Sequence, residues 1–178
     1  ELIIKKQDSA KISSNTSVIK QLEKQKVKLI VTSPPYPGIR VIYDHWQILG
    51  RKETRIPYWI ANGLDGHSYE YYNLGRRTEK NLTTYFRRLE DTFREISKIC
   101  AKNTLIVQVV GFNDVRSQMQ KYLDVMDRCG FEERFLSYNP ESKLKRIKRS
   151  VPNRGWQANS KGAIDASKEF VLFHKLKK

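Results

Sequence analysis

The sequence predicts an α/β fold with a mostly parallel sheet, helices on both faces of that sheet and an antiparallel strand at one edge. Two compact apolar runs, Val27–Val31 and Thr104–Val110, lack strict alternation, which is typical of strands covered on both faces. Segments with helical periodicity separate the apolar runs along the chain, and this order is typical of α/β proteins. No helical pattern separates the last two predicted strands, so we expect them to pair antiparallel.

The first predicted elements are short. Leu2–Ile4 reads as a strand that ends in a turn containing Asp8. Asn15 or Ser14 can cap a following helix. That helix would carry three apolar residues on one face: Val18, Ile19 and Leu22.

The strand Val27–Val31 stops at a proline-rich segment, Thr32–Gly38. Its three prolines remove three backbone donors, so a sheet ladder cannot continue through it. From about residue 37 to 78 the apolar residues follow no sustained helical or strand period, and the sequence is rich in Tyr, Trp, Arg and Gly. This indicates a large functional loop or insertion.

A long amphipathic helix follows, with Thr78 as its expected cap. Its apolar residues recur at steps of three and four: Leu82, Tyr85, Phe86, Leu89, Phe93, Ile96 and Ile99. The strand Thr104–Val110 then ends at Gly111. The next helix begins near Val115 and is closed by Gly130.

Two more strands are predicted, Phe131–Tyr138 and Glu169–Phe173, with a basic loop at about 139–168 between them. A chain of 178 residues fits one domain with one core. The interpretation is therefore a single domain over 1–178 that carries one aromatic and basic insertion and one basic loop.

Composition excludes several classes of protein. No apolar run is long enough to span a membrane, and no signal peptide is recognisable, so a cytoplasmic protein is expected. Cys100 and Cys129 have spacings that suggest neither a disulfide framework nor a metal site. Both are in phase with apolar neighbours, which indicates small buried residues rather than an activated nucleophile for C5-cytosine chemistry.

The net charge of +15 favours a polyanionic partner, and nucleic acid is the better candidate because the bases are spread among aromatics rather than gathered on one amphipathic helix. A merely soluble basic surface is the alternative. The predicted nucleic-acid contacts lie in the insertion and the basic loop: Arg40, Trp46, Arg51, Lys52, Lys143, Lys145, Arg146, Lys148, Arg149 and Arg154. The aromatics of the insertion could equally form a core of their own.

The most informative motif is Ser33-Pro34-Pro35-Tyr36, placed directly after a buried strand. In open α/β sheets the carboxyl ends of the strands form the ligand crevice. The motif resembles the catalytic motif of amino methyltransferases that modify exocyclic nitrogens of DNA bases with S-adenosylmethionine. Its serine form is more similar to the N4-cytosine subgroup than to the N6-adenine subgroup. The resemblance runs nearly end to end and implies a Rossmann-like methyltransferase sheet.

The resemblance implies roles for these residues. The Ser33 hydroxyl and the Pro34 carbonyl would accept hydrogen bonds from the amino group, and Tyr36 would stack on an extruded base. Two successive prolines, Pro34 and Pro35, hold that carbonyl in a fixed direction. By the same resemblance, the cofactor S-adenosylmethionine would lie near Asp8, Thr32 and Ser33, although Asp8 could equally be an ordinary turn residue.

One part of the family pattern is missing. Such enzymes carry a Gly-rich turn after their first strand, whereas no two of the nine glycines here are separated by one residue. The chain therefore resembles the catalytic half alone, without the first strands of the sheet. An upstream segment or a second polypeptide would supply the cofactor-binding part, or the chain is an inactive remnant.

Three functions stay open. The first is the catalytic part of a DNA methyltransferase acting on cytosine N4, as in restriction-modification. The second is a methyltransferase acting on adenine N6 in DNA, on RNA or on a protein glutamine. The third is a DNA-binding subunit without activity, which the missing glycine turn favours.

Overall fold

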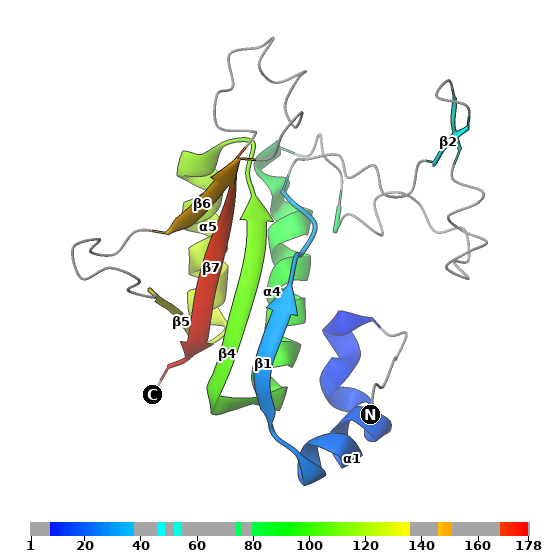
Figure 1. Ribbon diagram of the computed structural model, residues 1–178, viewed down its shortest axis with the longest axis vertical. Coiled ribbons are helices and arrows are strands. Elements are labelled where there is room, and N and C mark those ends of the chain that lie inside the picture. The colour runs from blue at the N-terminus through cyan, green and yellow to red at the C-terminus, as the bar shows by residue number, and fades with distance from the viewer. Residues whose placement is uncertain are drawn as a thin grey trace.

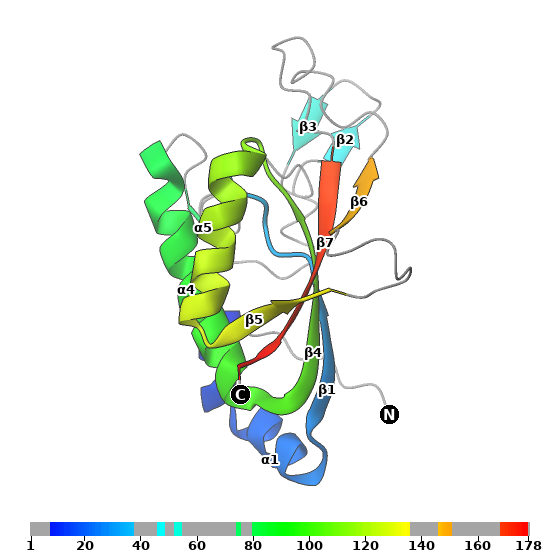
Figure 2. The same cartoon turned by 90° about the vertical axis from the view of Figure 1, so that its left-hand side faces the viewer.

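The computed structural model shows a sheet with two long helices packed against one of its faces (Figures 1 and 2). It describes residues 8–37, 46–48, 52–54, 74–75, 80–135, 146–150 and 168–177. The predicted strand Leu2–Ile4 lies outside these residues.

Within the described residues the main sheet has five strands. The order is β1 (Val27–Thr32), β4 (Cys100–Gly111), β7 (Lys168–Leu176) and β5 (Phe131–Arg134), and β6 (Ile147–Ser150) also pairs with β7. β1 and β4 are parallel, whereas β7 is antiparallel to β4, β5 and β6. Four strands therefore point the same way and β7 alone runs against them.

This arrangement confirms the predicted fold class, a mostly parallel α/β sheet with an antiparallel strand. The last two predicted strands do pair antiparallel, as β5 and β7. The antiparallel strand lies one place inside the edge, between β4 and β5. β6 was not predicted, because it falls within the basic loop at about 139–168 and its four residues are all exposed, so no apolar pattern marks it.

The helices α4 (Thr83–Ile99) and α5 (Val115–Arg128) pack on the same face of the sheet (Figure 2). The apolar period predicted for α4 is confirmed. Its buried side chains meet those of α5 and of alternate residues on β4 and β7 in one core: Leu82, Tyr85, Phe86, Leu89, Phe93, Ile96, Ile106, Val110, Phe112, Met119, Tyr122, Val125, Met126, Cys129, Phe131, Phe170 and Leu172. Helices were expected on both faces, but the described helices cover only this one.

The helix ends follow local side-chain chemistry. The Asn15 side chain caps α1 (Thr16–Lys24) by accepting from the backbone N–H groups of Ser17 and Val18, which confirms one of the two predicted caps. A short 3₁₀ turn, η2 (Lys80–Leu82), precedes α4, and the expected cap Thr78 lies outside the described residues.

β1 corrects one expectation. The run Val27–Val31 does form a strand, but it is not covered on both faces, since residues Leu29 and Val31 are 55% and 69% exposed. Leu29 and Val31 alternate with Ile30, which packs against the core under the helices. β1 is the first strand of the described sheet, and the face opposite the helices carries no described helix (Figure 2).

Two short strands lie within the predicted insertion. β2 (Trp46–Ile48) and β3 (Lys52–Thr54) pair antiparallel with each other. In the part of the chain that the structure describes, no helix has the length and apolar character needed to cross a membrane.

Candidate active site at the carboxyl end of strand β1

The Ser33–Tyr36 turn leaves the sheet where two parallel strands end side by side. Thr32, the last residue of β1, pairs with Gln108 near the end of β4. The chain then continues as Ser33-Pro34-Pro35-Tyr36-Pro37, in which the Ser33 side chain is exposed and that of Tyr36 is half-buried. The turn therefore sits at the edge where open α/β sheets bind ligands.

The Ser33 hydroxyl is oriented by the neighbouring strand. Its Oγ donates to the backbone carbonyl of Val109 on β4 at 3.2 Å, and it also lies 3.4 Å from the Tyr36 hydroxyl. A hydroxyl has one hydrogen and two acceptor lone pairs. With its hydrogen directed at Val109, Ser33 presents oxygen lone pairs and so acts as an acceptor toward anything that approaches from outside.

A helix holds the turn from the other side. Tyr85, in the first turn of α4, donates its hydroxyl to the Pro35 carbonyl at 2.7 Å. Burial raises the pKa of the Tyr85 phenol well above its usual value, so the hydroxyl stays protonated and keeps donating. The Pro35 carbonyl is therefore committed to Tyr85, whereas no bond to the Pro34 carbonyl is seen among the described residues. The acceptor role of Pro34 stays a prediction.

The Tyr36 side chain is hydrogen-bonded to a residue at the start of β7. Its hydroxyl donates to Glu169 Oε1 at 2.8 Å, and Arg149 Nε donates to Glu169 Oε2 at 2.5 Å. Glu169 is only 5% exposed and pairs across the sheet with Gly111 on one side and Arg149 on the other. The backbone of β4 and side chains from β6, β7 and α4 thus meet around the turn that follows β1.

Sequence reasoning missed two residues of this site, Tyr85 and Glu169. Both carried a signal. Tyr85 occupies an apolar helix position where a hydroxyl needs a partner. Glu169 places a carboxylate in an otherwise apolar strand, where burial requires donors. Neither signal names its partner, because Tyr36 and Pro35 are distant in sequence.

Three basic residues of the predicted nucleic-acid surface, Arg146, Lys148 and Arg149, make contacts within the protein. Arg146 forms two bonds, of 2.7 and 2.8 Å, to the Glu133 carboxylate, and these hold the pKa of Arg146 above its usual value. Lys148 Nζ lies 5.7 Å from the centre of the Phe170 ring. Trp46 and Lys52 belong to β2 and β3. The other predicted contacts lie outside the described residues: Arg40, Arg51, Lys143, Lys145 and Arg154.

Asp8 is not brought to the Ser33 turn by any described contact. It caps the 3₁₀ helix η1 (Ser9–Ser14) by accepting from the Ala10 N–H. The Ser13 hydroxyl of η1 bonds Glu95, which lies ten residues along α4 from Tyr85, or about 15 Å at the rise of an α-helix. η1 and the turn are therefore fixed near opposite ends of α4, and a cofactor contact by Asp8 stays a prediction.

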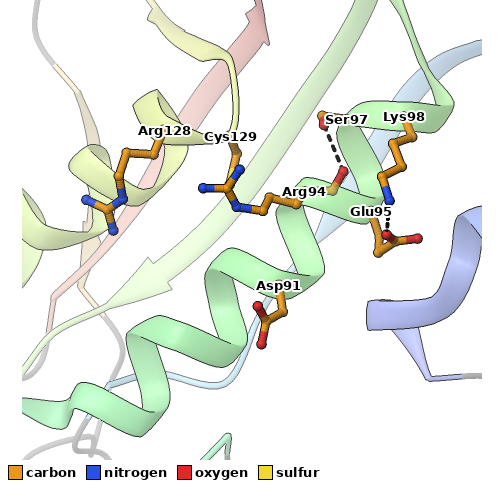
Figure 3. A pocket seen from close by; sticks show the side chains of 7 residues that line it. All are labelled: Asp91, Arg94, Glu95, Ser97, Lys98, Arg128 and Cys129. Carbon is orange, nitrogen blue, oxygen red and sulfur yellow. Dashed lines mark hydrogen bonds and ion pairs between the residues drawn. The ribbon is translucent and has the colours of Figure 1, made fainter.

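A separate polar depression of about 350 Å³ is lined by residues from the carboxyl-terminal half of α4 and from the end of α5 (Figure 3). Its cationic groups are already matched by acids. Arg94 and Arg128 both bond the Glu90 carboxylate, which lowers the pKa of Glu90, and Lys98 bonds Glu95. The depression thus has the character of a surface ion-pair network.

Comparisons with known proteins give matches among solved structures alone. No protein-family model matches the sequence, and no curated protein does. The chain is similar to TTHA0409 of Thermus thermophilus, described as a "Putative DNA Modification Methylase". Two of its crystal structures match with TM-scores of 0.41 and 0.40, at 15% and 18% identity, over 89% of this chain and 50% and 51% of that one. A third, of TTHA0409 complexed with S-adenosyl-L-methionine, matches with a TM-score of 0.37 at 16% identity, over 89% of this chain and 52% of that one. The chain thus spans about half the length of these proteins.

Proposed function

We propose that this chain is the catalytic part of a DNA amino methyltransferase that acts on the N4 nitrogen of cytosine. The observation that carries the proposal is the Ser33–Tyr36 turn itself. It sits at the tip of a parallel strand, presents the Ser33 hydroxyl as an acceptor and is anchored through Pro35 and Tyr36, while no hydrogen bond to the Pro34 carbonyl is seen among the described residues.

The geometry suits the chemistry of an exocyclic amine. The lone pair of that nitrogen is delocalised into the ring, so the nitrogen must become tetrahedral before it attacks a methyl carbon. The Ser33 oxygen and the Pro34 carbonyl would accept from its two N–H groups and stabilise the positive charge that develops there. The anchored turn keeps both acceptors in place before the base arrives.

The methyl group would come from S-adenosylmethionine: as the N–C bond forms, the S–C bond breaks and its electron pair stays on sulfur, and the methylated nitrogen then loses one of its protons to water. The described residues fit the reacting end of such a site, because Ser33 and Thr32 stand at the strand tip where the methyl donor and the amine must meet. The Gly-rich turn that would hold the rest of the cofactor is not in this sequence. We therefore place it on an upstream segment or on a second polypeptide.

The exposed face of β1 supports this partner. Leu29 and Val31 lie on the same face as half-exposed apolar residues of β4 and β7, opposite the helices: Leu105, Val107, Val109, Val171 and Phe173. An apolar face beside a strand edge that no other described strand pairs with favours a further polypeptide layer. The net charge of +15 supports DNA as the substrate.

The test is methyl transfer from labelled S-adenosylmethionine to duplex DNA, by the chain alone and together with its natural upstream segment. We expect label in DNA only when the segment is present, and digestion to nucleosides should yield N4-methylcytosine. Ser33→Ala should abolish transfer, whereas Ser97→Ala should not, because Ser97 bonds the Arg94 carbonyl on α4, outside the turn.

Other outcomes would favour the alternatives. N6-methyladenine in the digest would place the enzyme in the adenine subgroup, and label in RNA or in a protein glutamine would change the substrate class. If no label appears in any substrate while Ser33→Ala binds DNA as tightly as wild type, the chain is a DNA-binding subunit.

A further inference from the structure

Glu169 is the most buried charged side chain around the turn, and the methyl-transfer proposal gives it no role. Its two carboxylate oxygens receive donors from different elements: Tyr36 from the turn and Arg149 from β6. A buried carboxylate is stable only when donors and a positive charge compensate its lost hydration. Here the hydroxyl of Tyr36 supplies one of those donors.

The pairing pattern makes Glu169 a rigid support. It lies on β7, the strand that pairs with three others, and it is directly opposite Gly111, the last residue of β4. Arg149 is its cross-strand neighbour on β6, so the ion pair is set by sheet register as well as by attraction. The Arg149 side chain is 62% exposed, while that of Glu169 is 7% exposed. The carboxylate is therefore the fixed member of the pair.

Tyr36 is consequently held at both ends. Its backbone follows Pro35, whose carbonyl is bound by Tyr85 on the helix side. Its hydroxyl is bound by Glu169 on the strand side. A tyrosine ring has two rotatable torsions, and fixing its hydroxyl removes the freedom that would remain once the backbone is placed.

We propose that Glu169, braced by Arg149, is a positioning residue that sets the orientation of the Tyr36 ring beside Ser33. Arg149 then acts through Glu169 as a brace for the turn, a role that its place in the basic loop did not suggest. Where it concerns methyl transfer, this inference rests on the proposed function, because Tyr36 is the residue that would stack on the base.

The experiment compares Glu169→Leu and Glu169→Gln with a matched control, Glu133→Gln. Glu133 lies on β5, also pairs with β7 and also has its carboxylate bonded by an arginine, Arg146, but it has no described contact with the turn. In protein with ¹³C-labelled tyrosine rings, the Tyr36 signal is identified by its loss in Tyr36→Phe. We expect this signal to shift in Glu169→Leu, to shift less in Glu169→Gln, which keeps one acceptor oxygen, and to stay in place in Glu133→Gln.

The kinetic arm asks whether this position matters for the reaction. In Glu169→Leu we expect kcat for methyl transfer to fall by about 10-fold to 100-fold while KM for DNA stays within about 2-fold, because a displaced ring impairs alignment more than affinity. The double variant with Tyr36→Phe should be no worse than Tyr36→Phe alone, since both changes break the same bond.

The two arms separate the two proposals. An unmoved Tyr36 signal in Glu169→Leu overturns the positioning role, whatever the activity. A shifted signal with unchanged kcat also overturns it as a role in the reaction. If the wild-type chain methylates nothing even with its upstream segment present, the proposed function fails, and a shifted Tyr36 signal still establishes that Glu169 places the ring.

Discussion

Replacing Tyr85 by Phe tests how firmly the helix holds the Ser33–Tyr36 turn. The Tyr85 hydroxyl is buried and donates to the Pro35 carbonyl at 2.7 Å. Its removal deletes one hydrogen bond and leaves a partly buried carbonyl without that donor, which together cost about 1–2 kcal/mol of unfolding free energy. With an m-value of about 2 kcal/mol/M in urea, the unfolding midpoint should fall by roughly 0.5–1 M.

Tyr122 provides the matched control. It is also buried and lies on the neighbouring helix α5, but its hydroxyl differs from that of Tyr85 in its hydrogen bonding. Within the described residues the Tyr122 hydroxyl has no hydrogen-bond partner. Tyr122→Phe should therefore leave the midpoint unchanged or raise it, since an unpaired buried hydroxyl is itself unfavourable by about 1–3 kcal/mol. Equal losses in Tyr85→Phe and Tyr122→Phe, measured by urea unfolding with unchanged m-values, would refute the anchoring role of Tyr85.

Two further predictions concern titratable groups in the core. Burial lowers the pKa of His174 to about 4, against 6.5 in the unfolded chain. The negative charge of Glu133 acts in the opposite direction but is outweighed, and the positive charge of Arg146 lowers the pKa further. As pH falls below 6.5 the unfolded chain binds the proton first, so stability should drop by up to about 3 kcal/mol by pH 4. Urea unfolding at pH 7 and pH 4.5 should show a smaller drop for His174→Leu, and equal drops would contradict this account. Burial also raises the pKa of Cys100 and of Cys129 to about 11. At pH 8 both thiols should therefore react with a disulfide reagent about 100-fold more slowly in the native chain than in urea. Comparable rates in the two states would show that burial does not make these thiols unreactive.

The fold class and the main elements could be predicted from sequence because hydrophobic periodicity reports local burial. The seven-residue series from Leu82 to Ile99 located α4, and Gly130, at φ 84°, ends α5 as expected. β6 could not be found this way, since its stability comes from backbone pairing with β7 and its side chains are exposed. The exposure of Val31 was also missed, because an apolar run reveals that a strand can be buried and not which neighbours cover it.

Sequence alone located the Ser33–Tyr36 turn of the candidate site, but not the residues that hold the turn in place. Proline stiffness and a strand tip are local properties, so the motif Ser33–Tyr36 could be recognised. The partners Tyr85 and Glu169 come from 50 and 133 residues away along the chain, and such contacts depend on the completed sheet. For the same reason Arg146 and Arg149 looked like parts of one basic loop, although each bonds a different acid, Glu133 and Glu169.

The place of β7 in the sheet has a consequence for biosynthesis. This strand follows all the other described strands in the chain, yet it lies between β4 and β5 and also receives β6. During translation the edges of β4 and β5 that will pair with β7 therefore stay unpaired until β7 leaves the ribosome. Pairing between strands that are far apart in the sequence slows folding, and unpaired strand edges promote aggregation. A nascent chain stalled before Lys168 should therefore depend on chaperones far more than the finished protein does.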